Sequence, residues 1–102
     1  MKDDIESRAP KLATVRQRID RLDKQLLRLL NHRAELALLI GHIKKRRKWP
    51  VFDANREAFV LRHVMDANRG PLSARAVHHV FQAVLCECRR RQQVRRRSVH
   101  RR

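Results

Sequence analysis

Aromatic residues, glycine and proline are scarce in this chain. Of its 102 residues, only 4% are aromatic, 2 are glycine and 3 are proline. Glycine and proline supply the tight turns of sheet proteins, so their scarcity disfavours a turn-rich β fold and favours helices. Since 42% of the residues are still hydrophobic, the core of this one small domain has to be built mainly from aliphatic side chains.

Acidic residues are also few, because 10 Asp and Glu stand against 26 Lys and Arg, which gives a net charge of +16. This excess favours an anionic partner, which could be nucleic acid, an acidic membrane surface or a small acidic metabolite. No apolar run is long enough to span a membrane, and residues 1–10 lack the apolar run of a secretory signal. We therefore expect a cytoplasmic protein without a membrane partner.

Cysteine occurs only at positions 86 and 88. On a helix, Cys86 and Cys88 would point in different directions, so we expect no disulfide between them. Free thiols fit the reducing cytoplasm. No other side chains stand at the spacing of a metal site, so we expect no bound metal.

The apolar pattern and the helix signals predict an all-α fold of three helices, over residues 11–48, 54–68 and 74–93. Pro10 suits the first turn of the first helix, and Pro50 ends that helix, because a residue before proline is pushed out of helical geometry. Asp53 and Ser73 are suitable N-caps for the second and third helices. The last nine residues, 94–102, are expected to form a disordered basic tail.

The first helix is too long to be covered by its own chain. About 38 residues extend roughly 57 Å, whereas a compact domain of this size has a radius of gyration of about 13 Å. The simplest cover is the same helix of a second copy, related by a two-fold axis. We therefore predict a homodimer built around paired long helices. The apolar positions of this helix follow one face nearly from end to end: Val15, Ile19, Leu22, Leu26, Leu29, Leu30, Ala37, Ile40 and Ile43.

Two cations, Arg33 and Lys44, interrupt this apolar face. A charge on a buried face is costly unless an anion meets it. Polar residues also break the apolar faces of the other two helices, where Glu57 is in register with Val60 and Gln92 follows Cys88. Together these residues predict a polar pocket enclosed by three helices.

The spacing of the cations indicates the size of the anion and the number of chains around it. Arg33 and Lys44 are eleven residues apart, so they share a helix face about 16 Å apart and could hold a compact dianion. Arg16 lies roughly 26 Å from Arg33 along the same helix and about 100° around it. In an antiparallel dimer, Arg16 of one copy could enter the pocket of the other, which would give two shared sites.

Three motifs occur in this order between Leu12 and Gln93. They are the start R-x-x-I-D-x-x-D-x-x-L-L-x-L-L, the G-x-x-K step from Gly41 to Lys44, and the turn P-V-x-D-x-x-R-E. Each motif alone is weak, but their order and spacing are highly specific. On these motifs the chain resembles the all-helical AroQ-class chorismate mutases.

The resemblance implies that residues 1–93 form a chorismate mutase domain within an intertwined, domain-swapped homodimer. It implies an isomerase that converts chorismate to prephenate in the biosynthesis of phenylalanine and tyrosine, without a cofactor. Arg33 and the partner's Arg16 would bind the two substrate carboxylates. Lys44 would contact the ether oxygen and a carboxylate, and Gln92 would donate to the same ether oxygen.

The remaining site residues implied by the resemblance come from the second and third helices. Glu57 would accept a hydrogen bond from the ring hydroxyl, with Asp53 beside it and Arg56 helping to position these groups. Cys88 departs from the family pattern, because a small hydroxyl residue commonly stands there near a substrate carboxylate. A thiol is a weak donor, so we expect a weak contact between Cys88 and the substrate carboxylate.

Two alternatives stay open. The first is an isochorismate-pyruvate lyase of the same fold, which uses similar cations, although residues 50–57 and Gln92 favour the mutase. A basic helical dimer that binds nucleic acid is the alternative from another class, carried by the arginine runs 89–91 and 95–97. We interpret these runs as solvated charge, since stacking aromatics and a recognition-helix signature are lacking. A second enzyme of the aromatic pathway is a further possible partner.

Overall fold

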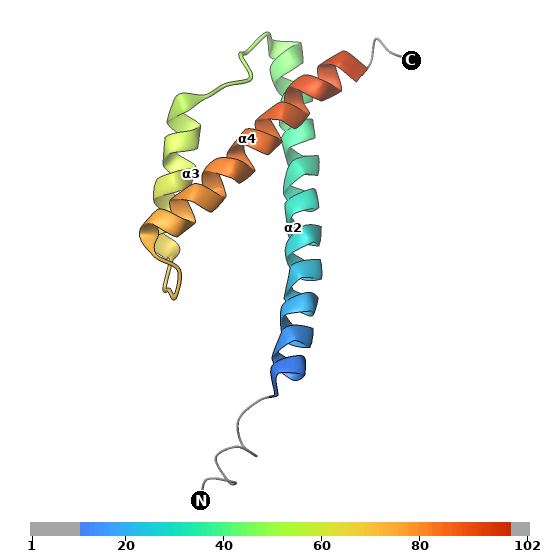
Figure 1. Cartoon of the computed structure of the whole chain (residues 1–102). Helices are drawn as coiled ribbons and strands as arrows, with labels where there is room; N and C mark the ends of the chain where they lie inside the picture. The colour runs from blue at the N-terminus through green and yellow to red at the C-terminus, as the bar shows by residue number, and fades with distance from the viewer. Residues whose placement is uncertain (1–10, 99–102) are drawn as a thin grey trace, which may run out of the picture. The chain divides into compact units, whose positions relative to one another are not determined.

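The computed structural model describes residues 11–98, of which residues 94–98 are described by their backbone alone. The described residues form three α-helices and no strand, in agreement with the predicted fold class (Figure 1). In chain order these are α2 (Leu12–Arg47), α3 (Ala54–Ala67) and α4 (Ala74–Ser98).

The ends of α2 and α3 agree with the sequence to within one residue, but the end of α4 does not. We expected this helix to end at residue 93, and it continues to Ser98. No glycine or proline follows Pro71, and arginine has a high helix propensity. Nothing in the sequence therefore stops the helix at residue 93. The first part of the expected disordered tail is helical, and residues 99–102 lie outside the described residues.

Both predicted N-caps are present. The Asp53 carboxylate accepts a hydrogen bond from the backbone N–H of Arg56 at 3.0 Å, and the Ser73 hydroxyl accepts one from Ala76 at 3.1 Å. Each bond satisfies one of the backbone donors left free in the first turn of a helix. The caps therefore fix where α3 and α4 begin.

The end of α2 is a left-handed cap at Lys48, which has a φ of 59°. The backbone N–H of Lys48 donates to Lys45, and that of Trp49 donates to Lys44 at 2.8 Å. These two bonds form the Schellman arrangement, in which glycine usually occupies the left-handed position. The chain therefore leaves the helix just before the Trp49-Pro50 pair.

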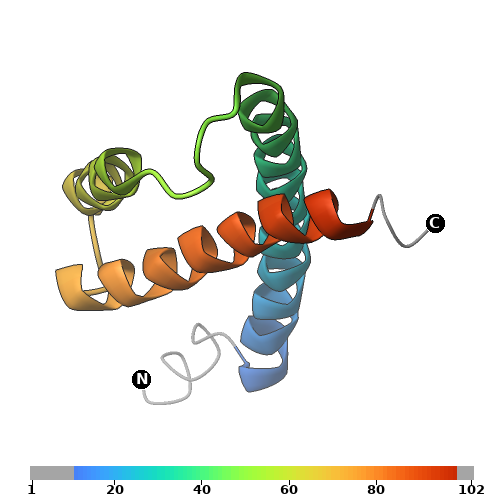
Figure 2. The same ribbon diagram turned by 90° about the horizontal axis from the view of Figure 1, so that it is seen from above.

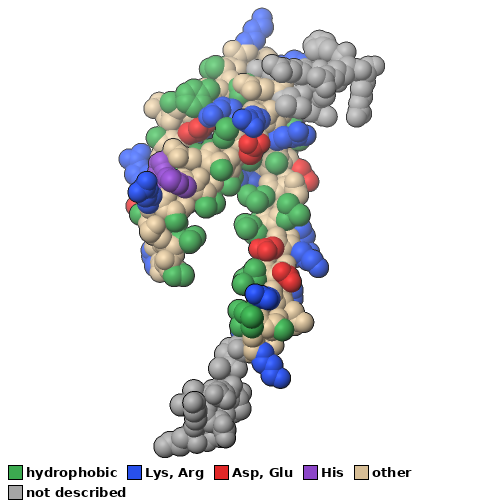
Figure 3. All heavy atoms as spheres, in the orientation of Figure 1, with side chains coloured by type: hydrophobic (Ala, Val, Ile, Leu, Met, Phe, Trp, Pro, Cys, Tyr) green, Lys and Arg blue, Asp and Glu red, His purple; other side chains and the backbone are tan. Residues whose placement is uncertain are grey.

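The described chain consists of two units, residues 11–31 and residues 32–98. The first unit is the N-terminal part of α2, in which no residue is buried. Its large apolar side chains lie at the surface, and Leu22 and Leu29 are 61% and 66% exposed. Hydrophobic side chains are visible along this part of α2 in the space-filling view (Figure 3).

The second unit contains the rest of α2 together with α3 and α4. All three helices contribute to its small core, which consists of Ala37, Val60, Val77, Leu85 and Cys88. Val80 belongs to the apolar pattern of α4 but is 52% exposed.

Within this unit, α4 crosses the C-terminal part of α2, as both ribbon views show (Figure 2). The crossing is close because Gly41 of α2 faces Gln92 of α4. A Cβ atom at Gly41 would lie 3.2 Å from the Cβ atom of Gln92. None of the helices within residues 11–98 combines the length and the apolar character that crossing a bilayer requires.

Candidate functional site

The second unit contains a cavity of about 510 Å³ that is open to the surface on one side. Its walls come from α2, from the segment before α3 together with the first two turns of α3, and from the C-terminal half of α4. This volume lies in the range of pockets that bind small organic molecules. The apolar part of the wall is aliphatic and includes Leu36, Ile40, Val60 and Leu85.

Seven of the eight residues predicted for the site line this cavity: Arg33, Lys44, Asp53, Arg56, Glu57, Cys88 and Gln92. The chain therefore brings together side chains that lie up to 59 positions apart in its sequence, from Arg33 to Gln92. The eighth residue, Arg16, is exposed on α2 in the first unit. The individual roles of these eight residues stay predictions.

The two cations of α2 differ in their partners. Lys44 is half-buried, and its ammonium group donates a hydrogen bond of 2.6 Å to the backbone carbonyl of Val51. An ammonium group has three N–H donors, so two remain for a ligand. Arg33 is also half-buried and makes no hydrogen bond or ion pair with the residues that the structure describes. Within residues 11–98 no side chain or carbonyl engages its guanidinium donors, which are therefore available to an anion there.

The N-cap and the first turn of α3 carry three of the polar residues. Asp53 uses one carboxylate oxygen for the N-cap, as the sequence predicts. The Arg56 guanidinium lies over the Phe59 ring, at 5.2 Å from its centroid. Glu57 is half-buried and stands in the first turn, where the partial positive charge of a helix N-terminus favours a carboxylate.

Gln92 is the only polar residue in the buried class among those described, at 9% exposure. Its side-chain oxygen is buried and has no hydrogen-bond partner within residues 11–98. A buried amide atom without a partner is costly and is uncommon in native proteins. Since Gln92 also lines the cavity, a donor group of a ligand or a water molecule there can meet this acceptor oxygen.

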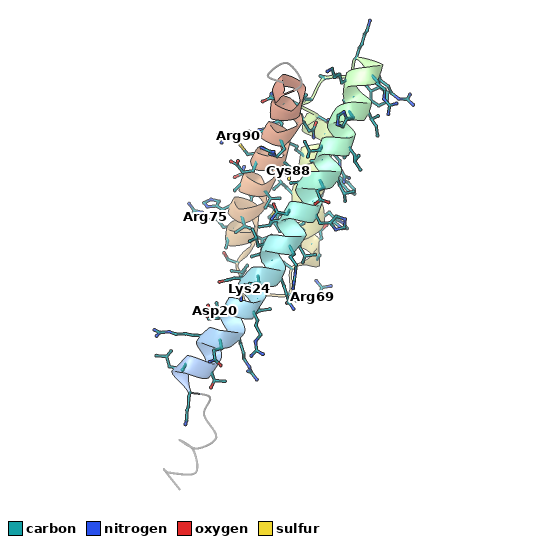
Figure 4. The ribbon with its side chains drawn as sticks, turned by 90° about the vertical axis from the view of Figure 1, so that its right-hand side faces the viewer. Asp20, Lys24, Arg69, Arg75, Cys88 and Arg90 are labelled. Carbon is teal, nitrogen blue, oxygen red and sulfur yellow. The ribbon has the colours of Figure 1, made fainter. Side chains whose placement is uncertain are left out.

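Cys88 is buried at 7% exposure on the same face of α4, one helical turn before Gln92. It lies on the side of α4 that faces α2, whereas Arg90 lies on the outer side (Figure 4). Cys86 and Cys88 are both free thiols, in agreement with the sequence prediction. The side chain of Cys88 thus contributes to the core and to the cavity wall at once.

Arg89 also lines the cavity, although its place in a run of three arginines predicts solvated charge. Its guanidinium forms an ion pair with the Glu57 carboxylate and lies 4.9 Å from the centroid of the Phe52 ring. The hydrogen bond to Glu57 raises the pKa of Arg89 above its ordinary value, while partial burial opposes this shift. Helical spacing could have identified it, since Arg89 follows Leu85 by four positions.

With Arg89, four cations and two carboxylates line the cavity. The net charge of its wall is therefore positive by two, which favours an anion with about two negative charges. In the part of the chain that the structure describes, no three His, Cys, Asp or Glu side chains are placed to hold a metal ion. The wall thus offers cations that bind an anion, together with hydrogen-bond donors and acceptors.

Residues 15–93 match the family described as chorismate mutase type II. A bifunctional chorismate mutase/prephenate dehydratase from Neisseria gonorrhoeae is 42% identical over 73 residues, which are 72% of this chain and 20% of that protein. The enzyme of the same name from Pseudomonas aeruginosa is 38% identical over 82 residues, which are 76% of this chain and 22% of that protein. The chain thus spans about a fifth of the length of these relatives.

Among solved structures, form II of a chorismate mutase from Thermus thermophilus has a TM-score of 0.80 with this chain. The two are 24% identical, and the match covers 82% of this chain and 96% of that chain. The likeness shows that both chains share one all-helical fold.

Proposed function

Because the chain belongs to the chorismate mutase type II family, we propose that it converts chorismate into prephenate in the biosynthesis of phenylalanine and tyrosine. The observation that carries this proposal is the cavity of residues 32–98, with its positive wall and its buried Gln92 amide. Chorismate is a small dianion, so its charge and size suit that cavity.

The reaction breaks one carbon–oxygen bond and forms one carbon–carbon bond within a single molecule. It needs no nucleophile and no proton transfer, so the protein has two tasks. It has to hold the flexible substrate in the compact conformer in which the two ends can react. It also has to meet the negative charge that develops on the ether oxygen with donors already in place.

Arg33 suits the first task, because its planar guanidinium can bind a carboxylate through two parallel hydrogen bonds. Glu57 suits it as well, since its carboxylate can accept a hydrogen bond from the ring hydroxyl of the substrate. Arg56 and Asp53 would help to hold the substrate from the first turn of α3.

Lys44 and Gln92 suit the second task. The Lys44 ammonium is a compact charge that can meet a single oxygen, and its bond to Val51 holds it at the cavity wall. The Gln92 amide donates a hydrogen bond without having to be protonated. Both would donate to the ether oxygen, where the charge develops.

We further propose that two copies of the chain form a domain-swapped homodimer with two shared sites. The support is the exposed apolar face of residues 12–31, where Leu22, Leu26 and Leu29 are all more than half exposed. A surface of this extent needs cover in water. A second copy would supply that cover, and the partner's Arg16 would then bind the second substrate carboxylate.

A prephenate-consuming enzyme is the protein partner that we propose, because the relatives from Neisseria and Pseudomonas are named for both activities. The free thiols of Cys86 and Cys88 suit a reducing compartment such as the cytoplasm. Adding a prephenate dehydratase to the purified chain and measuring kcat/KM for chorismate tests the partner.

The purified chain should be incubated with chorismate and, in a separate reaction, with isochorismate, and the products identified. We expect loss of chorismate with formation of prephenate, and a much lower rate in the Lys44→Ala variant. Release of pyruvate from isochorismate without prephenate formation would support the lyase instead. Turnover of neither compound would contradict both enzyme assignments.

A further inference from the structure

Two neighbouring arginines of α4 form ion pairs of different kinds. Arg90 pairs with Glu87 on the same helix at 3.2 Å, and both side chains are about two-thirds exposed. Arg89 instead pairs with Glu57 of α3, and these side chains are 29% and 24% exposed. An exposed pair within one helix contributes little to structure, so only the second pair connects two walls of the cavity.

The guanidinium of Arg89 is held from two sides. Glu57 accepts its hydrogen bond, and the Phe52 ring lies 4.9 Å away from its central carbon. A planar guanidinium can use its face for an aromatic ring and its edge for a carboxylate at the same time, which an ammonium group cannot do. Phe52 and Glu57 flank the Asp53 cap, so Arg89 contacts the segment that begins α3 at two points.

The ion pair leaves Glu57 able to act on a substrate. Arg89 engages Oε2 of this carboxylate, and each carboxylate oxygen has two acceptor sites. Oε1 can therefore accept a hydrogen bond from a hydroxyl in the cavity. Without a partner, the Glu57 side chain would sample several rotamers, and binding a substrate would have to order it at an entropic cost.

We propose that Arg89 is a positioning residue of the mutase reaction, which fixes the Glu57 carboxylate in the orientation that accepts the substrate hydroxyl. This inference rests on the proposed function and assigns a role to a residue outside the predicted site. Arg89 acts through Glu57 and does not touch the reacting atoms. Its contribution is to order the carboxylate before the substrate arrives, which lowers the barrier of a reaction that depends on orientation.

The test compares Arg89→Met with Arg90→Met, since methionine keeps an unbranched apolar stem at both positions. We expect Arg89→Met to lower kcat/KM for chorismate about tenfold. This is the size of effect expected when one long side chain, here that of Glu57, has to be immobilised on binding. We expect Arg90→Met to leave kcat/KM unchanged. The conservative variant Arg89→Lys should recover part of the loss, because it keeps the charge and loses the planar stack.

A double substitution with Glu57→Gln separates positioning from a general structural role. If Arg89 acts through Glu57, adding Arg89→Met to the Glu57→Gln variant should change kcat/KM little further. The change should be less than about twofold, which is the usual tolerance when the effects of two substitutions are compared. If the two effects multiply in full, the inference is overturned while the mutase function stands. If wild-type protein does not turn over chorismate, the proposed function fails and this inference fails with it.

A folding defect is detected independently of turnover. In urea denaturation, the free energy of unfolding of each variant should fall with urea concentration at the same slope as that of wild type. Of the two Arg89 variants, Arg89→Lys should retain more of the stability. Arg89 would have a structural role only if three results came together. These are lost turnover in Arg89→Met, full turnover in Arg89→Lys, and effects of Arg89→Met and Glu57→Gln on kcat/KM that multiply in full. This outcome would contradict the proposal.

Discussion

Residues 12–31 and residues 32–47 belong to one helix and share one apolar periodicity, but they differ in what covers them. The first part leaves Leu22 and Leu29 more than 60% exposed, whereas the second part buries Ala37 and Gly41 against the other helices of its unit. Periodicity therefore identifies the face of a helix that has to be covered, and does not identify what covers it. In the second part the cover comes from the same chain. In the first part none of the described residues is buried, and a second copy is the cover that we propose.

Replacing Leu22 by alanine should have the largest effect on stability if a second copy covers the first part of α2. In the single chain this side chain is 61% exposed, so its truncation would cost almost nothing. In a dimer core the same truncation costs about 2–5 kcal/mol. Urea denaturation at two protein concentrations measures the difference, because the stability of a dimer depends on concentration.

Lys24 provides the control for this variant, because it is exposed and, at about 100° per residue, lies about 200° around α2 from Leu22, on the opposite side of the helix. Lys24→Ala should leave the free energy of unfolding within about 0.5 kcal/mol of wild type. An equally small effect of Leu22→Ala would show that the apolar face of residues 12–31 is not an interface.

Replacing Lys44 by alanine should have the largest effect on catalysis among changes in the second unit. Loss of a donor to a developing negative charge typically lowers kcat by about 10²- to 10³-fold. The neighbouring Lys45 is exposed and does not line the cavity, so Lys45→Ala should keep normal kcat/KM. Steady-state kinetics with chorismate compares the two variants, and equal rates would remove Lys44 from the proposed mechanism.

Gly41→Ala should have an intermediate effect on both stability and turnover. An alanine at an exposed helix position stabilises the helix by about 1 kcal/mol relative to glycine. At Gly41 the added Cβ would lie 3.2 Å from Gln92, and such overpacking costs about 1–3 kcal/mol. We expect lower stability in urea and a lower kcat, because Gln92 has to move. A gain in stability with unchanged kcat would contradict this tight crossing of α2 and α4.

Lys48→Gly should have the smallest effect, and the effect should be favourable. Lys48 adopts a left-handed conformation with a φ of 59°, which costs a residue with a side chain about 1–2 kcal/mol. Replacement by glycine would remove this strain, but part of the stabilisation would be lost because glycine raises the conformational entropy of the unfolded chain. The expected increase in the free energy of unfolding is about 0.5 kcal/mol, with unchanged kcat/KM. Destabilisation would show that the Lys48 side chain makes a contact of its own.

Much of the second unit could be predicted from the sequence. Its helices follow from periodicity and from the Asp53 and Ser73 caps, whose hydrogen bonds are present. The cavity follows from polar residues placed on apolar faces, and Arg33, Glu57 and Gln92 all line it. These predictions succeeded because each depends on local chemistry and on which face of a helix a residue occupies.

Other features depended on contacts between distant parts of the chain. Arg89 lies within a run of three arginines, and only the approach of α3 to α4 distinguishes it from Arg90. The continuation of α4 past residue 93 carries no sequence signal either, because no glycine or proline follows Pro71 to mark an end. The close crossing at Gly41 likewise needs the position of Gln92, which periodicity does not provide.

In the homodimer that we propose, residues 12–31 of one copy complete the cavity in residues 32–98 of another. Arg16→Ala and Lys44→Ala should each inactivate both sites of a homodimer. After equal amounts are unfolded and refolded together, half of the dimers should be mixed, and each mixed dimer should contain one site with neither substitution. We predict that the mixture regains about a quarter of the wild-type rate with chorismate. A rate no higher than the mean of the two separate variants would contradict the shared site.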